Sequence, residues 1–137
     1  VKNISVTSAS DMAEAVLSLP APDYYVSAAA ISDFAPDRSA EKIHSGKPVS
    51  LELKPLPKLI PQMSGRGSKI IGFKIGEDAE EAGRRLLAEE DVILVAANYP
   101  ETMGAKTGEY ILLTEGAEHR VSGEKDAVAR EIWDAVL

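Results

Sequence analysis

The feature that most limits the fold is a short apolar run at residues 92–97. Its sequence, Val-Ile-Leu-Val-Ala-Ala, has no alternation of polar and apolar side chains. Such a run is typical of a strand that helices cover on both faces, as in a parallel sheet. A helix with acidic residues on its outer side is expected just before it, at 78–90. The chain therefore favours a layered α/β domain with this strand near its centre.

Other strands and helices alternate along the chain. Period-2 or β-branched patterns predict strands at 4–7, 24–30, 49–53, 69–73 and 110–114, with a brief edge at 120–121. Caps and helical spacing predict helices from Ser10 to about Ser18, at 57–63, at 78–90 and from Ser122 to Leu137. Residues 31–48 are expected to be mostly loop, and 64–68 a turn. This order predicts a Rossmann-like, three-layer α/β fold with a mostly parallel sheet.

The amino-acid composition excludes several kinds of functional site. The 137 residues are enough for one domain and include no cysteine, which excludes disulfides, thiol catalysis and cysteine metal sites. Two histidines, His44 and His119, are too few and too far apart in sequence for a histidine-built metal centre. No apolar run approaches the roughly 20 residues of a membrane span. No secretory signal pattern is seen either, so a cytoplasmic location without a membrane is expected.

The charge is unevenly distributed. The formal net charge is −7, which argues against a nucleic-acid partner. Residues 35–70 carry seven basic against three acidic side chains, a net of +4, whereas 71–137 carry seven against fifteen, a net of −8. A basic middle in an acidic protein indicates a local site for an anion.

Ligands of parallel α/β sheets bind beyond the carboxyl ends of the strands. The segment after the expected second strand has small residues, Ala28, Ala29 and Ala30, and then Asp33. Small side chains let a flat ligand approach the backbone, and the carboxylate can accept hydrogen bonds from a hydroxyl or hold a metal ion. The same residues also fit a packed strand end followed by a solvated aspartate.

Two glycine-containing loops have a composition that bears on phosphate binding. The loop at 41–47 carries Lys42 and Lys47, which can close over phosphates, but an ordinary solvated loop has the same composition. Pro48 follows Gly46-Lys47, so this is not a Walker loop. Residues 64–68, Ser-Gly-Arg-Gly-Ser, lack the third glycine of a dinucleotide fingerprint and are expected to form only a turn.

Taken in order, several short segments resemble phosphopantothenoylcysteine synthetase (phosphopantothenate–cysteine ligase), the synthetase domain of the pantothenate-metabolism flavoproteins. The series is Ala29-Ala30-Ile31-Ser32-Asp33-Phe34, Lys42-Ile43, Leu51-Glu52-Leu53, Pro57-Lys58-Leu59-Ile60, Ile71-Gly72-Phe73 and Val95-Ala96-Ala97-Asn98. It spans about 70 residues in the order found in that family.

The resemblance implies a reaction in coenzyme A biosynthesis. CTP or ATP activates the carboxylate of 4'-phosphopantothenate as an acyl-nucleotide with loss of pyrophosphate, and the amine of cysteine then displaces the nucleoside monophosphate. Magnesium is required. FMN is implied only for the decarboxylase domain often fused upstream, which is not seen in this chain. Like charges meet when a carboxylate attacks an α-phosphate, so fixed cations and a metal suit the chemistry.

The resemblance also implies roles for single residues. Lys42 matches the family's essential lysine and is the expected catalytic residue. Nucleotide contacts are implied for Ala28, Ala29, Ala30, Asp33, Lys42, Pro57, Lys58, Leu59, Ile60, Phe73 and Arg85. His44 and Ser45 stand where the family has further lysines, so Lys47, Arg84 or Arg85 are expected substitutes.

The chain resembles only part of that domain. The glycine-rich turn and asparagine-bearing segment that open the family's domain have no match here, so the chain is expected to be an incomplete, inactive portion. Family members commonly dimerise, and residues 49–53 are an expected place for homodimer contacts. Two other functions fit the sequence: a non-catalytic module that binds a nucleotide or phosphorylated ligand, and an acidic α/β interaction domain with no small-molecule site.

Overall fold

The computed structural model describes residues 2–37 and 42–137. Its main sheet has five strands in the order β1-β4-β5-β6-β7, and β2 and β3 form a separate pair. The elements in chain order are α1 (Ala9–Leu17), β1 (Tyr24–Ser27), β2 (Phe34–Pro36), β3 (Leu53–Pro55), α2 (Leu59–Met63), β4 (Lys69–Ile75), α3 (Ala79–Leu87), β5 (Val92–Asn98), the 3₁₀ turn η1 (Pro100–Thr102), β6 (Thr107–Thr114), β7 (Ala117–Glu124) and α4 (Lys125–Asp134).

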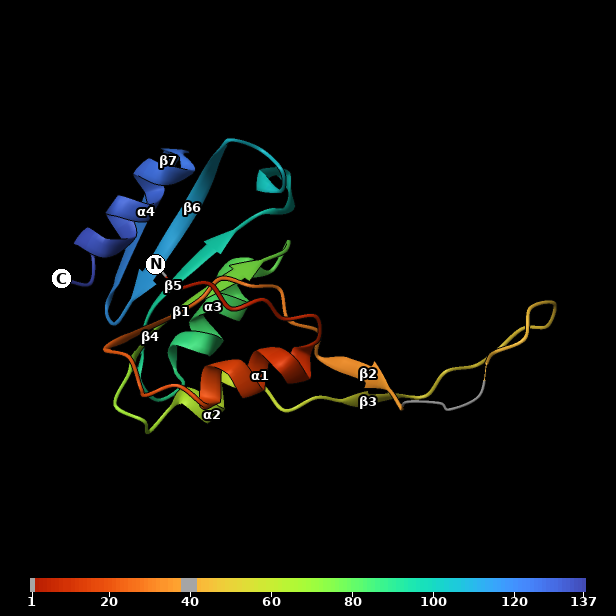
Figure 1. The fold of residues 1–137 in the computed structure, drawn as a ribbon. Helices are drawn as coiled ribbons and strands as arrows, with labels where there is room; N and C mark the ends of the chain where they lie inside the picture. Colours follow the sequence, from red (N-terminus) through yellow and green to blue (C-terminus); the bar gives the residue numbers. More distant parts are fainter. Residues whose placement is uncertain (1, 38–41) are drawn as a thin grey trace.

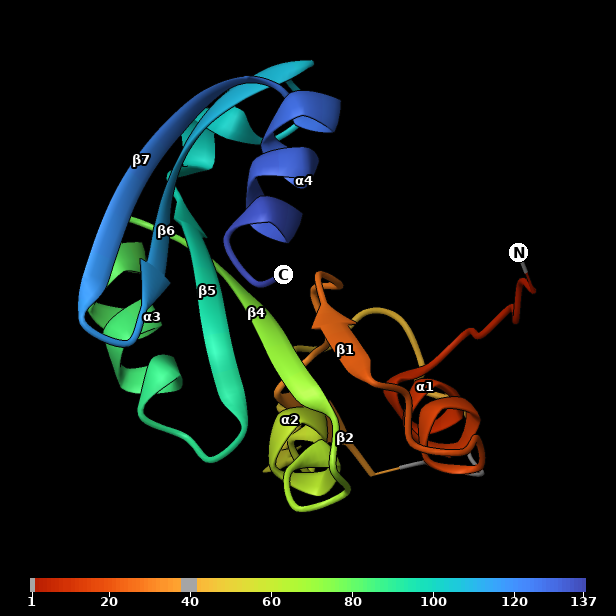
Figure 2. The same cartoon turned by 90° about the vertical axis from the view of Figure 1, so that its left-hand side faces the viewer.

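Four of the five strands of the main sheet run in one direction. β1, β4 and β5 are parallel neighbours, β6 is antiparallel to β5, and β7 is antiparallel to β6. Helix α3 lies on one side of this sheet and α4 on the other (Figure 2). The expected Rossmann-like, three-layer fold with a mostly parallel sheet is therefore confirmed.

Two clusters of buried side chains form the core, one on each face of the sheet. Along β5, Val95 and Ala97 belong to the cluster beneath α3, whereas Leu94 and Ala96 belong to the cluster beneath α4. All four are at most 1% exposed, which explains why this strand shows no polar alternation. The expectation of a central strand at 92–97 is confirmed, and the strand continues to Asn98.

Helix α3 packs against the sheet at two glycines. A Cβ atom at Gly72 of β4 would lie 2.6 Å from Leu86 Cδ2, and one at Gly83 of α3 would lie 2.8 Å from Leu113 Cδ1. Only hydrogen atoms fit at these points, so the helix approaches the strands more closely than larger residues would allow. The helix thereby covers β4, β5 and part of β6.

The start of the chain differs from expectation in two ways. Residues 4–7 form no strand, because a β-branched pattern needs a neighbouring strand to pair with, and the described residues provide none there. Helix α1 begins earlier than expected. Ser8, not Ser10, is its N-cap and accepts a hydrogen bond from the Asp11 backbone N–H at 3.0 Å. Hydrogen bonds from Thr7 to the Asp11 carboxylate lower the pKa of that group.

The middle of the chain forms a two-stranded arm. β2 lies within the stretch 31–48 expected to be mostly loop, and the strand expected at 49–53 is wrong except for Leu53, which begins β3. β2 and β3 pair over only three residues, with prolines at Pro36 and Pro55. Proline has no N–H to donate, so it limits extension of such a ladder.

The strand expected at 24–30 is β1, which is shorter than expected and ends at Ser27.

The expected helix at 57–63 is confirmed as α2, the turn at 64–68 is confirmed, and the helix at 78–90 is confirmed as the shorter α3.

The C-terminal expectation is corrected at β7. The brief edge expected at 120–121 is a full strand of eight residues, paired to β6 along its whole length. Ser122 is therefore within β7 and does not cap the last helix; Glu124 takes the N-cap position of α4. Pairing with β6 overrides the local capping signal of the serine.

Within the described residues, no helix combines the length and apolar character needed to cross a membrane.

The close approach of α3 to the sheet predicts a large penalty for a side chain at position 83. Gly83→Val places a branched side chain against Leu113 and Val95, and we expect it to lower the free energy of unfolding by about 2 kcal/mol or more, measured by urea denaturation. Ala129→Val, on the exposed side of α4, is the matched control and should cost less than about 1 kcal/mol. Equal losses in the two variants would show that Gly83 is not a contact point.

Candidate functional site

A cavity of about 200 Å³ lies where the chain leaves the carboxyl ends of β1 and β4. The segment before α2 and the last turn of α3 complete its walls. Its lining residues are Ser27, Ala29, Ile31, Ser32, Asp33, Leu56, Pro57, Lys58, Leu59, Ile60, Pro61, Phe73, Lys74, Leu86 and Glu89. The carboxyl edge of a parallel sheet is the usual place for a ligand in this class of fold.

Backbone contacts hold the two loop segments of the cavity together. The Leu56 N–H donates to the Asp33 carbonyl oxygen at 2.8 Å, which joins the segment after β1 to the segment before α2. The Ser32 hydroxyl donates to the carbonyl of Phe34 at 2.6 Å and so fixes the turn into β2. Residues far apart in the sequence therefore form one wall.

A second hollow of about 170 Å³ continues from this cavity toward α1. The two share Ile31, Ser32, Leu56, Pro57 and Leu59. Most of its remaining lining comes from α1. The combined groove therefore has a charged end at β4 and a mainly apolar end at α1.

Seven of the residues predicted from the sequence line the cavity: Ala29, Asp33, Pro57, Lys58, Leu59, Ile60 and Phe73. Phe73 also packs against the core cluster beneath α4. The other four predicted residues, Ala28, Ala30, Lys42 and Arg85, are exposed and do not line it. Their nucleotide contacts stay predictions.

Lys42 lies on the arm, away from the cavity. Residues 42–52 continue beyond β2 and β3, and this part of the chain projects from the body of the molecule (Figure 1). Lys42 and Lys47 are both exposed there. In this arrangement the arm carries the predicted catalytic lysine, while the sheet carries the cavity.

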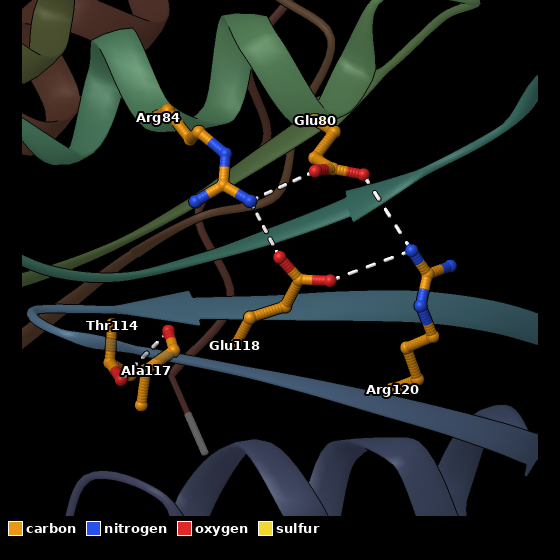
Figure 3. Close-up of polar contacts among 6 residues, drawn as sticks. All are labelled: Glu80, Arg84, Thr114, Ala117, Glu118 and Arg120. Carbon is orange, nitrogen blue, oxygen red and sulfur yellow. Dashed lines mark hydrogen bonds and ion pairs between the residues drawn. The ribbon is translucent and has the colours of Figure 1, made fainter.

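The arginines of α3 are engaged in ion pairs on the helix surface. Arg84 donates to Glu80 at 2.9 Å and to Glu118 of β7 at 2.5 Å, and Arg120 lies 3.5 Å from Glu118 (Figure 3). The hydrogen bonds that Arg84 donates to the carboxylates of Glu80 and Glu118 raise the pKa of its guanidinium. Arg85 pairs with Glu81 at 2.5 Å. The Arg84–Glu118 pair ties α3 to the β6–β7 hairpin, whereas the Arg85–Glu81 pair lies within α3.

Asn98 of the resembling series is the last residue of β5. Its buried amide donates to the Thr102 hydroxyl, which in turn donates to the Tyr99 carbonyl at 2.8 Å. The asparagine thus closes the turn into η1 and does not reach the cavity.

Sequence reasoning missed two charged residues of the cavity, Lys74 and Glu89. Lys74 follows Phe73 at the end of β4, and this position was a usable signal. Glu89 lies just after α3, among several solvated acids, and nothing in the sequence sets it apart.

Tyr25 of β1 is partly buried, and this burial raises the pKa of its hydroxyl. A hydrogen bond with Ser27 partly offsets the rise.

The described residues contain no group of three or more His, Cys, Asp or Glu side chains placed to hold a metal ion. The cavity does offer two carboxylates, Asp33 and Glu89. Mg²⁺ at nucleotide sites is typically held by one or two carboxylates together with phosphate oxygens and water. The donor set therefore fits a magnesium ion that enters with a nucleotide.

Comparison with known proteins identifies the family. The DNA/pantothenate metabolism flavoprotein C-terminal domain matches residues 1–137, the whole chain. The chain belongs to this family. The resemblance to the synthetase portion of the pantothenate-metabolism flavoproteins, seen in the sequence, is thereby confirmed.

Two curated relatives carry the name coenzyme A biosynthesis bifunctional protein CoaBC. The protein of Thermococcus kodakarensis is 34% identical over 123 residues, which cover 83% of this chain and 30% of that protein. The protein of Bacillus subtilis is 34% identical over 113 residues, 77% of this chain and 27% of that protein. The chain therefore spans less than a third of the length of these relatives.

A solved structure shows the same fold. The crystal structure of the DNA/pantothenate metabolism flavoprotein from Streptococcus pneumoniae superposes with a TM-score of 0.79 and 19% sequence identity. The match covers 96% of this chain and 70% of that one.

Proposed function

We propose that this chain is part of a phosphopantothenate–cysteine ligase that acts in coenzyme A biosynthesis. Its family and its CoaBC relatives support the pathway. The observation that carries the proposal is the cavity at the carboxyl ends of β1 and β4, where seven residues predicted to contact a nucleotide lie together. They come from three separate stretches of the chain, so their meeting does not follow from sequence proximity.

In the proposed reaction, a carboxylate oxygen of 4'-phosphopantothenate attacks the α-phosphorus of CTP or ATP. The bond from that phosphorus to the pyrophosphate oxygen breaks, and pyrophosphate leaves. The amine nitrogen of cysteine then attacks the acyl carbon, loses a proton and releases CMP or AMP. Magnesium held by Asp33 and the phosphates would neutralise part of the negative charge.

The cavity walls suit the nucleotide in three ways. Ala29 leaves the backbone after β1 open to a flat ligand. The segment 57–60 lines the cavity at the start of α2, and Phe73 adds an apolar side chain near the end of β4. The alanines at 28–30 are exposed, and β1 is hydrogen-bonded on only one side within the described chain, with Val26 44% exposed.

A strand of a parallel sheet is normally covered on both faces, and the open edge of a sheet can pair with a further strand. The open side of β1 therefore supports the further proposal that ligation needs more of the domain than these 137 residues. The size of the relatives is consistent with it, since the chain spans 30% of one and 27% of the other.

We expect the isolated chain to bind CTP or ATP saturably but to form no phosphopantothenoylcysteine. The binding is measured by calorimetric titration, and the ligation by mass spectrometry with phosphopantothenate, cysteine, Mg²⁺ and either nucleotide. Ligation by the isolated chain would contradict its proposed incompleteness. Absence of saturable binding would contradict the nucleotide site and favour an interaction domain.

Lys42 is proposed to neutralise phosphate charge as the α-phosphate is attacked, after the arm moves toward the cavity. In the full-length enzyme, Lys42→Ala should lower kcat by about 10²- to 10³-fold, the usual loss when a cation at the reacting phosphate is removed. Lys106→Ala, an exposed lysine outside the cavity, is the control and should keep full activity. If Lys42→Ala weakens only nucleotide affinity, a non-catalytic phospholigand-binding module is the better description.

We further propose that the full-length protein forms a homodimer through the arm. Val49, Leu51 and Leu53 are each more than half exposed on a segment that projects from the body. Leu51→Asp with Leu53→Asp should convert the dimer to a monomer in sedimentation experiments, because burying two carboxylates in an apolar contact is costly. Leu19→Asp, an exposed leucine outside the arm, should leave the dimer intact. A wild-type monomer would overturn the proposal.

A further inference from the structure

We propose that Lys74 is the fixed cation of the cavity and binds the phosphate groups of the nucleotide. This inference rests on the proposed nucleotide-dependent function. Neither the family match nor the relatives assign a role to this lysine. It lies at the carboxyl end of β4, directly after Phe73, and lines the cavity together with Lys58.

The position of Lys74 in the sheet holds it firmly. β4 is bonded to β1 on one side and to β5 on the other, and Lys74 stands opposite Ala97 in the register with β5. Its side chain is half-buried, whereas Lys42 and Lys47 are exposed on the arm. A cation anchored on a central strand loses less conformational entropy on binding an anion than one carried by an exposed loop.

The alternation along β4 directs Lys74 toward α3. Side chains two residues apart lie on the same face of a strand. A Cβ atom at Gly72 would point at Leu86 of α3, so Lys74 lies on the α3 face as well. Leu86 and Glu89 line the same cavity, which is consistent with this placement.

The other cations considered for this role have different surroundings. Arg84 and Arg85 are held by carboxylates on the surface of α3 and do not line the cavity. Where both partners are described residues, the one lysine paired with a carboxylate is Lys54, with Asp37 at 2.5 Å. Lys74 is thus available to an anion.

Two acids share the cavity with the lysines. Asp33 and Glu89 balance Lys58 and Lys74, so the empty cavity has no net charge from these four groups. A triphosphate with bound magnesium carries both signs of charge and suits such a mixed lining better than a lone anion. We therefore expect the phosphate groups to lie near Lys74 and the magnesium ion to lie near Asp33.

A fixed cation acts differently from the arm lysine. We assign Lys74 to phosphate oxygens whose charge does not change as the α-phosphorus is attacked, so it contributes equally to binding of the substrate and of the transition state. Its loss should raise the Kd and KM for the nucleotide and leave kcat nearly unchanged. Loss of Lys42 should mainly lower kcat. A raised KM on loss of Lys74 and a lowered kcat on loss of Lys42 would therefore distinguish the roles of the two lysines.

The test compares Lys74→Gln with Lys69→Gln, which removes an exposed lysine at the opposite end of the same strand. Each chain is titrated with CTP and cytidine, and with ATP and adenosine. We expect Lys74→Gln to weaken triphosphate binding about tenfold or more, as for loss of a charge-assisted hydrogen bond, and to leave nucleoside binding unchanged. Lys69→Gln should change neither. Lys74→Arg should retain most of the affinity, and Lys74→Met serves in the same titrations if the glutamine variant unfolds.

Two results would overturn the inference. If Lys74→Gln and Lys74→Met bind triphosphates as tightly as the unsubstituted chain, or lose nucleoside and triphosphate affinity equally, Lys74 does not bind phosphate, although the nucleotide site stands. If the unsubstituted chain binds no nucleotide saturably, the proposed nucleotide site is wrong and this inference fails with it.

Discussion

The structure depends on the packing of α3 against a central strand that is buried on both faces. Gly72 and Gly83 remove side chains where the helix crosses the sheet, so Leu86 and Leu113 can fill the space between the layers. This contact fixes the last turn of α3 relative to the end of β4. The cavity lies at that junction, because Leu86 and Glu89 form one side of it and Lys74 another.

The cavity and the arm are built on different structural supports. The cavity is built on the rigid sheet, whose strands hold Phe73 and Lys74 in fixed positions. The arm is a two-stranded ladder of three residue pairs, limited by prolines, and carries exposed lysines and leucines. We propose nucleotide binding for the cavity at the sheet edge, and catalysis by Lys42 and self-association for the arm. Such a division suits a reaction whose charge is neutralised in stages.

Local signals failed where pairing between distant segments decided the structure. Residues 4–7 have the pattern of a strand but no partner, while β7 formed despite polar residues at Glu118, Arg120 and Ser122 because β6 lies beside it. The cap was misplaced for the same kind of reason: Ser122 has the composition of an N-cap but stands within a paired strand. At α1 the sequence indicated Ser10 as the N-cap, whereas it is Ser8 that accepts the capping hydrogen bond from the Asp11 backbone N–H.

The sequence by itself determined the class of fold, the central strand and the family, because hydrophobic periodicity and the order of short motifs are properties of the chain alone. The resemblance to the family also pointed to seven residues that line the cavity, and for two of them, Ala29 and Asp33, the position after a strand pointed the same way. Only the tertiary structure decided that these residues meet, that Arg84 and Arg85 are engaged elsewhere, and that Lys74 joins the site. These outcomes depend on contacts between segments far apart in sequence, which no local pattern encodes.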